Sequence, residues 1–230
     1  MNSEDLPFTR DQFLDMFAAY NQAIWPAQIV AYALGITALA VMAWRLRIAD
    51  RAVAAILAAF WVWLGVEFLW LHLRTIDTGP GPVVFAIAFV LQGIMWLIAG
   101  VVRHDLRFSS DVTPFSILGG VLIAYAMLVY PLLGIVSGHV YPRQPMFGVA
   151  PCPTTIFTFG ILLLTLTRVP KYLLAIPFAW AVISGLSAPL NFGIYEDFGL
   201  LIAGIVGTGL LFWRDRQPAI GVSRRRAYSQ

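Results

Sequence analysis

Glu67 is the acidic residue that lies deepest within an apolar stretch of the chain. A carboxylate is costly in lipid, so its side chain should face protein or water. On a helix Glu67 and Arg74 share one face, because they are seven residues apart. The same face carries Trp63 and Trp70. Two interpretations stay open: a structural ion pair with Arg74, or a site for a proton or a small cation.

A second candidate site lies in the proline-rich segment 138–153, which contains His139, Tyr141 and Cys152. Cys152 stands between two prolines, just before a threonine pair that includes Thr155. Because a helix N-terminus favours a thiolate, Cys152 is either a reactive thiol or a small residue that fills a tight helix start. His139 and Cys152 can also bind a soft metal, although two ligands are a weak signal. Whether a metal binds is left open.

The composition shows what kind of protein must position these residues. Hydrophobic residues make up 60% of the 230 positions and charged residues 12%, whereas soluble domains have about 45–50% and about 25%. An ordinary water-soluble globule is therefore excluded. The single cysteine excludes an intrachain disulfide and any metal or iron–sulfur site that needs several thiolates of this chain. No histidine or lysine is placed for a buried haem or a retinal Schiff base. We therefore expect no cofactor.

An amphipathic helix is predicted near the N-terminus, at 9–20. Thr9 can cap it, and Gln12 three residues later can complete a capping box. Phe8 and Phe13 flank the helix start as a hydrophobic staple. Apolar residues then recur every three or four positions. We expect this helix to lie on the membrane surface before the first span.

Seven apolar segments follow, most of them near the length of about 20 residues that crosses a bilayer. They predict one all-α integral membrane domain, 1–230, with seven transmembrane helices after the amphipathic helix. The predicted spans are 26–44, 52–73, 82–102, 114–137, 153–167, 170–186 and 198–213, with a cytoplasmic tail at 214–230. The segments that begin at Pro26 and Pro153 are partly similar. A 3+1+3 arrangement of two parallel three-helix units is therefore an open alternative.

The basic residues predict the orientation of these spans. Twelve of the fifteen lie in the first, third and fifth connections and the tail, and three lie on the other side, namely Arg10, Arg74 and Arg143. By the positive-inside rule, the N-terminus is outside and the C-terminus is cytoplasmic. Most acidic residues then lie outside, including Asp77, Glu196 and Asp197.

Four blocks of sequence carry a family resemblance: 20–28, 130–134, 139–142 and 147–160. The most specific is PCPTTIFTFG at 151–160. They resemble an uncharacterised family of small bacterial multi-pass membrane proteins, classed as a domain of unknown function. The resemblance covers nearly the whole chain. It implies a protein of the bacterial inner membrane, and it implies no activity.

The expected function is to bind or transport a small solute or ion through a polar pocket that opens to the outer side. The candidate ligand-binding residues are Asn21, Trp25, Glu67, Arg74, His139, Tyr141, Cys152 and Thr155. The alternative is a non-catalytic sensor or accessory subunit that contacts a partner protein. An intramembrane enzyme is disfavoured, because no base is spaced to activate the thiol.

The expected partners are the lipid bilayer and an unidentified small molecule or ion. A second copy of the chain or another membrane protein is a further candidate, and nucleic acid is not expected. The irregular backbone of the proline-rich segment needs hydrogen-bond partners that lipid cannot supply. We therefore predict that helix 9–20 packs over this segment and that Asn21 bonds its backbone.

Overall fold

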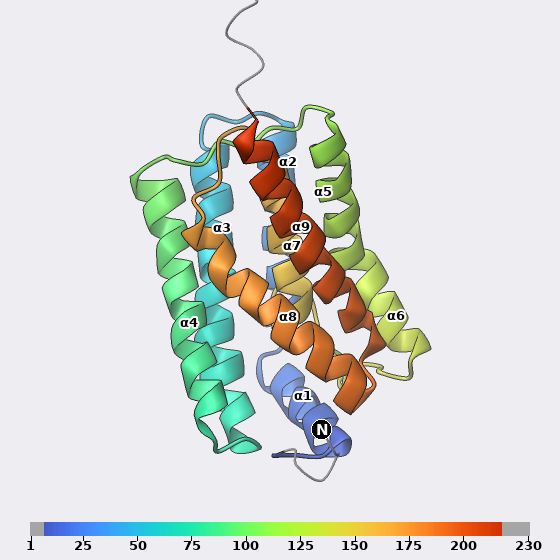
Figure 1. Cartoon of the computed structure of the whole chain (residues 1–230). Helices are drawn as coiled ribbons and strands as arrows, with labels where there is room; N and C mark the ends of the chain where they lie inside the picture. The colour runs from blue at the N-terminus through green and yellow to red at the C-terminus, as the bar shows by residue number, and fades with distance from the viewer. Residues whose placement is uncertain (1–6, 218–230) are drawn as a thin grey trace, which may run out of the picture.

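The computed structural model describes residues 7–217 and shows an all-helical protein (Figure 1). Within these residues no strand occurs, and only an isolated bridge joins Phe108 to Thr165. The all-α prediction is confirmed. The tail residues 218–230, with the arginines at 224–226, lie outside the described residues.

The helices follow the order of the predicted segments. They are α1 (Arg10–Ala23), α2 (Ala27–Ala43), α3 (Ala49–Trp63), α4 (Pro80–Trp96), α5 (Pro114–Ala124), α6 (Tyr130–Val136), α7 (Pro151–Leu163), α8 (Tyr172–Phe192) and α9 (Phe198–Arg216). Three stretches are π-helix. Leu64–His72 continues α3, Leu97–Val102 continues α4, and Tyr125–Val129 joins α5 to α6. Short 3₁₀ turns follow at Leu73–Thr75 and Tyr195–Asp197.

Five segments are long and apolar enough to cross a membrane, which is typical of a membrane protein. They are Ala49–Thr75, Pro80–Val102, Pro114–Val136, Tyr172–Phe192 and Tyr195–Arg216. Helices α1 and α2 make a sixth if they are counted as one segment across their 81° bend. The seven spans and the 3+1+3 repeat stay predictions, because α7 has 13 residues and is shorter than the thickness of a bilayer requires.

Among the differences in extent from the predicted spans, those at the ends of α7 and α8 bear on the site. α7 ends at Leu163, before the predicted end at 167. α8 continues past the predicted end at 186 to Phe192, with Pro189 inside it. It ends at Gly193, which adopts a left-handed conformation (φ 68°) that suits a helix C-terminus. The additional turn of α8 packs against α1, where it contributes to the candidate site.

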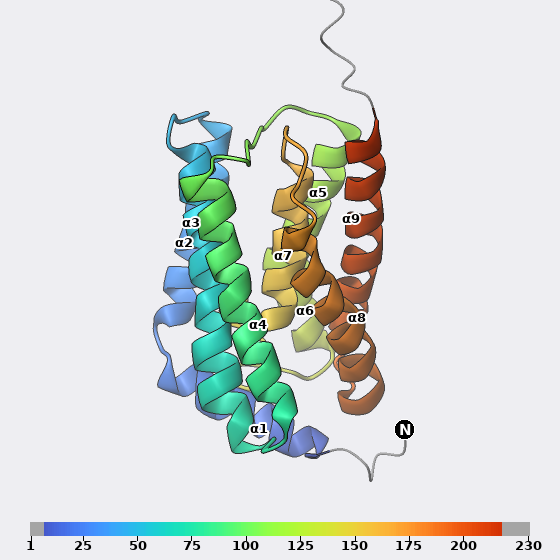
Figure 2. The same cartoon turned by 60° about the vertical axis from the view of Figure 1, so that its left-hand side comes forward.

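The short helix α7 forms the centre of the bundle. All its residues except Cys152 are buried. Figure 2 shows α2, α3 and α4 on one side of it and α8 and α9 on the other. Buried threonines give α7 polar contacts with its surroundings, and the indole Nε1 of Trp61 donates to Thr158 Oγ1 at 3.1 Å. The protein therefore surrounds α7 almost completely.

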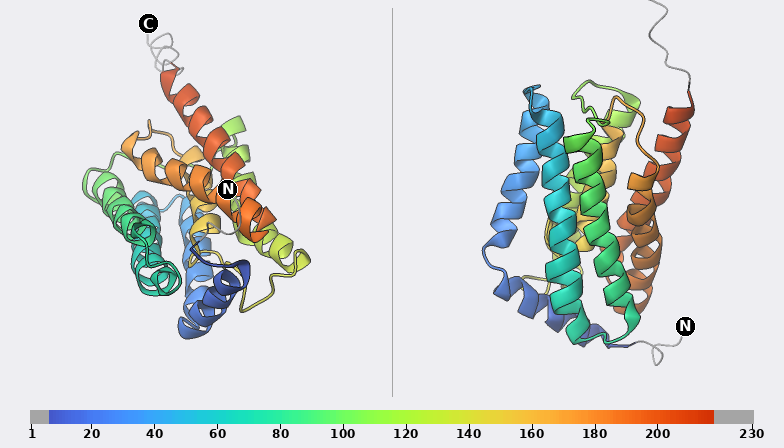
Figure 3. Two further views of the ribbon diagram at one scale, coloured as in Figure 1. Left: turned by 60° about the horizontal axis from the view of Figure 1, so that its bottom comes forward. Right: turned by 90° about the vertical axis from the view of Figure 1, so that its left-hand side faces the viewer.

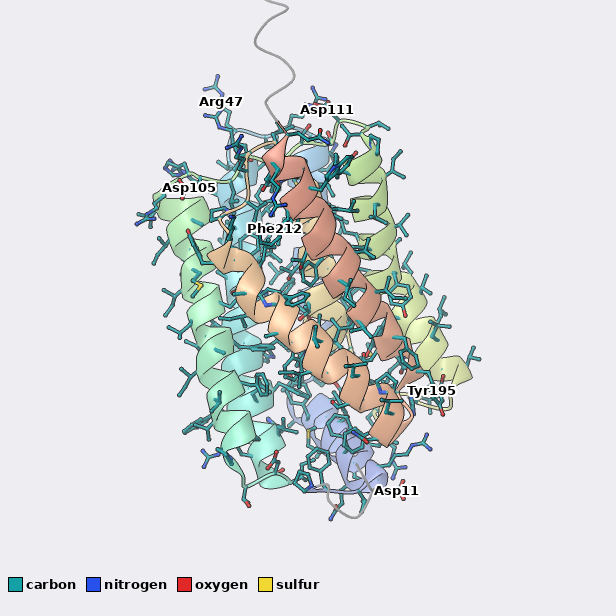
Figure 4. All side chains as sticks on the ribbon, viewed as in Figure 1. Asp11, Arg47, Asp105, Asp111, Tyr195 and Phe212 are labelled. Atoms are coloured by element: carbon teal, nitrogen blue, oxygen red, sulfur yellow. The ribbon has the colours of Figure 1, made fainter. Side chains whose placement is uncertain are left out.

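The two ends of the bundle differ in charge. The loops between α2 and α3, α4 and α5, and α7 and α8 lie at one end, as the labels of Arg47, Asp105 and Asp111 mark in Figure 4. These loops carry basic residues that the positive-inside rule predicts to be cytoplasmic, and we call this end the basic end. Helix α1 lies across the opposite end, which we call the α1 end (Figures 1 and 3).

Local signals at the start of α1 are confirmed. Thr9 Oγ1 accepts from Gln12 N at 3.3 Å, and Gln12 Oε1 accepts from Thr9 N at 2.8 Å, which completes the capping box. The rings of Phe8 and Phe13 stack at 5.4 Å. The apolar face of α1 packs against the other helices, where Phe17 and Tyr20 are buried. This face is therefore covered by protein.

Candidate functional site

A cavity of about 160 Å³ lies at the α1 end of the bundle, between α1, α4, α7 and α8. Aromatic side chains form most of its wall: Phe8, Phe13, Phe17, Phe68, Phe85, Trp180 and Phe192. Its polar side chains are Asp77, Cys152, Ser184, Ser187 and Asp197. The cavity is therefore mainly apolar with a few polar groups, which is typical of small-molecule sites.

Packing of the aromatic side chains in the wall holds α1 in place over the cavity. The Phe13 ring lies 5.4 Å from Phe8, 5.1 Å from Phe17 and 4.8 Å from Phe192, measured between ring centroids. Phe17 in turn lies 5.2 Å from Phe68, on the π-helix that continues α3. Since aromatic pairs at these distances add to the energy of burial, α1 is held to both α3 and α8.

The polar side of the cavity lies where α7, α8 and α9 meet. Cys152 Sγ is 3.3 Å from Ser184 Oγ. The hydroxyl of Tyr130 donates to Asp197 Oδ1 at 2.6 Å, and Asp197 is only 1% exposed. The indole Nε1 of Trp180 is buried without an acceptor in the described part of the chain. A buried donor that lacks a partner is costly, so this N–H is available to a ligand.

A second carboxylate, Glu196, is buried next to Asp197 and joins α1 through His139. Arg10 Nη2 lies 3.2 Å from His139 Nε2, and His139 Nδ1 lies 3.2 Å from Glu196 Oε1. A guanidinium can only donate, so Nε2 is the acceptor in the contact with Arg10, and Nδ1 is the nitrogen that can donate to Glu196. His139 then donates to Glu196. The three residues form a chain of hydrogen bonds in which the imidazole ring of His139 links the guanidinium of Arg10 to the carboxylate of Glu196.

The proline-rich segment is held by α1, as predicted. Asn21 Nδ2 donates to the carbonyl oxygens of Pro142 and Gln144 at 2.7 and 2.8 Å. Tyr20 Oη donates to the carbonyl of Val149 at 2.7 Å. The predicted contact of Asn21 with the backbone of this segment is therefore confirmed. Because Cys152 lies at the end of this segment, these bonds also fix the start of α7.

Prolines occupy the first and third positions of α7, Pro151 and Pro153, on either side of Cys152. A proline has no N–H, so two of the first three residues offer no donor to an anion. Further along the first turn, Thr154 Oγ1 donates to the carbonyl of Ala150 at 2.7 Å. The start of α7 is consequently poor in free donors. The Thr155 hydroxyl is fully buried and has no partner among residues 7–217.

Two of the predicted site residues lie next to the buried acidic pair, Glu196 and Asp197. Cys152 lines the cavity beside Asp197. His139 is 2% exposed and bonds the adjacent residue, Glu196. Asn21 supports the proline-rich segment, as described above. Thr155 lies one helical turn beyond Cys152.

The other predicted residues lie away from the cavity. Trp25 is 58% exposed and Tyr141 is 47% exposed. Arg74 stacks on the Trp70 ring, with its Cζ 4.3 Å from the ring centroid, and within the described residues no ion pair joins it to Glu67. The π-helix at Leu64–His72 explains this, because its wider turn changes which side chains share a face.

Asp197, Glu196 and Trp180 were not among the predicted site residues. Glu196 and Asp197 were placed only among the acidic residues on the outer side. Their signal was an adjacent acidic pair directly before an apolar span. The side chains that bury this pair come from distant parts of the chain; they are Tyr130, His139 and Cys152. Local spacing does not reveal such contacts.

Among residues 7–217 no group of three or more His, Cys, Asp or Glu side chains is arranged to hold a metal ion. His139 and Cys152 therefore do not belong to a larger ligand set there. No curated protein and no solved structure matches the chain. A family model described as "Family of unknown function (DUF6064)" matches residues 10–222. Because this match covers most of the chain, the protein belongs to that family.

Proposed function

We propose that the protein binds a small solute in the cavity at the α1 end, from the outer side of a bacterial inner membrane. The observation that carries this proposal is the cavity itself, with aromatic walls and buried polar groups that lack partners. A cavity of roughly 150 Å³ is large enough for one benzene molecule. The cavity at the α1 end has a similar volume, about 160 Å³, so we expect a ligand of about that size.

The charge distribution supports an outward opening. The loops at the basic end carry Arg45, Arg47, Arg51, Arg103, Arg107, Arg168 and Lys171. Bacterial membrane proteins retain such loops in the cytoplasm. The α1 end would then face outward, and the family resemblance is the reason for naming the bacterial inner membrane.

The bundle is closed between the cavity and the basic end. Trp61, Phe89, Phe157 and Phe159 are almost fully buried there. Gln92 is also buried and donates to the carbonyl of Leu173 at 3.0 Å. Mainly apolar side chains therefore fill this part of the bundle. Transport therefore needs a second conformation, and binding is the step that this geometry supports.

Native mass spectrometry of the purified full-length chain tests this proposal. We expect a reproducible small molecule bound to the wild-type protein. Ser187→Trp should remove it, because Ser187 lines the cavity and the larger side chain fills the space. The matched control is Ala179→Trp, on the lipid-exposed side of the same helix, which should retain the molecule. An empty wild-type protein that instead retains another polypeptide would favour the accessory-subunit alternative and contradict the proposal.

A further inference from the structure

We infer that the solute is a small organic cation, an amine or quaternary ammonium held by Asp197 and by the aromatic wall. This inference rests on the proposed solute-binding function and adds the chemical class of the ligand. Four features support it: the charge of the cavity lining, the pairing of the two buried carboxylates nearby, the start of α7 and the aromatic rings.

The charged groups that line the cavity are acidic. Asp77 and Asp197 contribute carboxylates, and no lysine, arginine or histidine is among the described lining residues. Asp77 Oδ1 accepts from the N–H of Gly79 at 2.9 Å, which fixes it near the start of α4. An anionic ligand would meet like charge without a compensating cation, whereas a cationic ligand would meet opposite charge.

The two buried carboxylates at the start of α9 are paired unequally. Glu196 is joined to the guanidinium of Arg10 through His139. Asp197 accepts a hydrogen bond from the neutral hydroxyl of Tyr130, and no ion pair includes it in the described part of the chain. A buried carboxylate without an opposite charge is unfavourable. A ligand cation in the cavity would supply that charge.

The start of α7 has few free N–H groups that could bond the Asp197 carboxylate or attract an anionic ligand. The N-terminus of a helix binds anions through its free N–H groups. Pro151 and Pro153 remove two of the first three, so the usual anion site is missing from this helix. This part of the cavity therefore offers a ligand the Asp197 carboxyl group and few backbone N–H donors.

The aromatic wall suits a cation with an apolar body. The faces of aromatic rings carry partial negative charge and attract ammonium groups, most strongly when water is excluded. Phe13, Phe192 and Trp180 lie on two helices that face the same space. The free Nε1–H of Trp180 can donate to one oxygen of the ligand. The geometry therefore favours an ammonium compound of about six to eight non-hydrogen atoms that carries a hydroxyl or ether oxygen.

The experiment compares two probes of the same shape on the purified full chain by isothermal titration calorimetry. Choline carries the charge, and 3,3-dimethyl-1-butanol is its neutral carbon analogue. We expect choline to bind at least tenfold more tightly. Asp197→Asn should reduce this preference by about tenfold while keeping the side-chain shape. Asp111→Asn, at the basic end and outside the cavity, is the control and should leave both affinities unchanged.

A second measurement needs no variant, so it does not depend on whether Asp197→Asn folds. The wild-type thiol of Cys152 is modified with a cationic trimethylammonium methanethiosulfonate or with an anionic sulfonate methanethiosulfonate. Both rates are divided by the rates for free cysteine. We expect the cationic reagent to be favoured at least tenfold, because it must approach beside Asp197.

Each outcome decides a different claim. If both probes bind equally and the two thiol reagents show the same relative rate, the cation inference is overturned while the solute site stands. If neither probe binds and native mass spectrometry also finds the cavity empty, the proposed function is overturned with it. Tighter binding of choline that Asp197→Asn abolishes supports both.

Discussion

The guanidinium of Arg10 lies 3.2 Å from Nε2 of His139, a residue 129 positions later in the chain. This contact ties the first turn of α1 to the segment that follows α6. Together with the stacked rings around Phe13, it fastens α1 over the cavity from two sides. The cover of the candidate site is thus built from residues that are distant in sequence.

His139→Ala should destabilise the protein by about 1–3 kcal/mol, because Glu196 loses its donor and stays buried. The measurement is the thermal unfolding midpoint in detergent. His104→Ala is the matched control, since His104 bonds Arg51 at the exposed basic end. Equal effects of the two substitutions would mean that the bond to Glu196 contributes little.

Asn21→Asp should be more damaging than Asn21→Ala. The Nδ2 group of Asn21 donates to two carbonyl oxygens, and an aspartate would place an acceptor against both. We expect a loss of about 2 kcal/mol for alanine and more for aspartate. The exposed neighbour Gln22→Ala serves as control. Limited proteolysis within 138–150 reports whether the segment has loosened. Unchanged cleavage in both Asn21 variants would contradict the supporting role of Asn21.

Alanine substitutions at two adjacent glycines of α5 should have opposite effects on stability. A Cβ on Gly119 would lie 2.4 Å from Leu164 Cδ1 and 2.7 Å from the carbonyl oxygen of Gly160, whereas Gly120 has nothing within 4 Å. Gly119→Ala should therefore cost about 1–3 kcal/mol by separating α5 from α7. Gly120→Ala should be neutral or stabilise the helix by up to about 1 kcal/mol. Thermal unfolding distinguishes them, and a tolerated Gly119→Ala would show that the two helices do not pack this closely.

The orientation can be tested with reporter fusions. Fusions after Arg47 and Arg107 should report a cytoplasmic location, and fusions after Asp77 and Gln144 an external one, because the basic loops stay inside. Alkaline phosphatase and green fluorescent protein give opposite signals on the two sides. Two consecutive fusions on the same side would contradict both the orientation and the outward-facing cavity.

The local features of this fold were predictable from the sequence, and the site was predictable only in part. The capping box of Thr9 and Gln12 depends on residues three apart, so its pattern is visible in the chain. Apolar stretches likewise indicated the long helices. The proline-rich segment drew attention to His139 and Cys152 because so rigid a stretch is unusual.

The remaining parts of the site depend on contacts that spacing does not encode. Asp197 is buried by Tyr130, which lies 67 residues earlier in the chain. The expected pairing of Glu67 with Arg74 assumed an α-helix, and the π-helix there changes the faces that side chains share. A regular helical wheel therefore fails at that point.

Reaction of Cys152 with a membrane-impermeant maleimide, applied from outside to intact cells, tests most directly whether the cavity opens outward. Cys152 is the single cysteine of the chain, so the wild-type protein can be used, with Cys152→Ala as the blank. We predict labelling in the native state, faster in Phe13→Ala because the aromatic cover over the cavity is loosened. Labelling only after detergent unfolding would show a thiol buried as filler and would contradict a cavity open to the outer side.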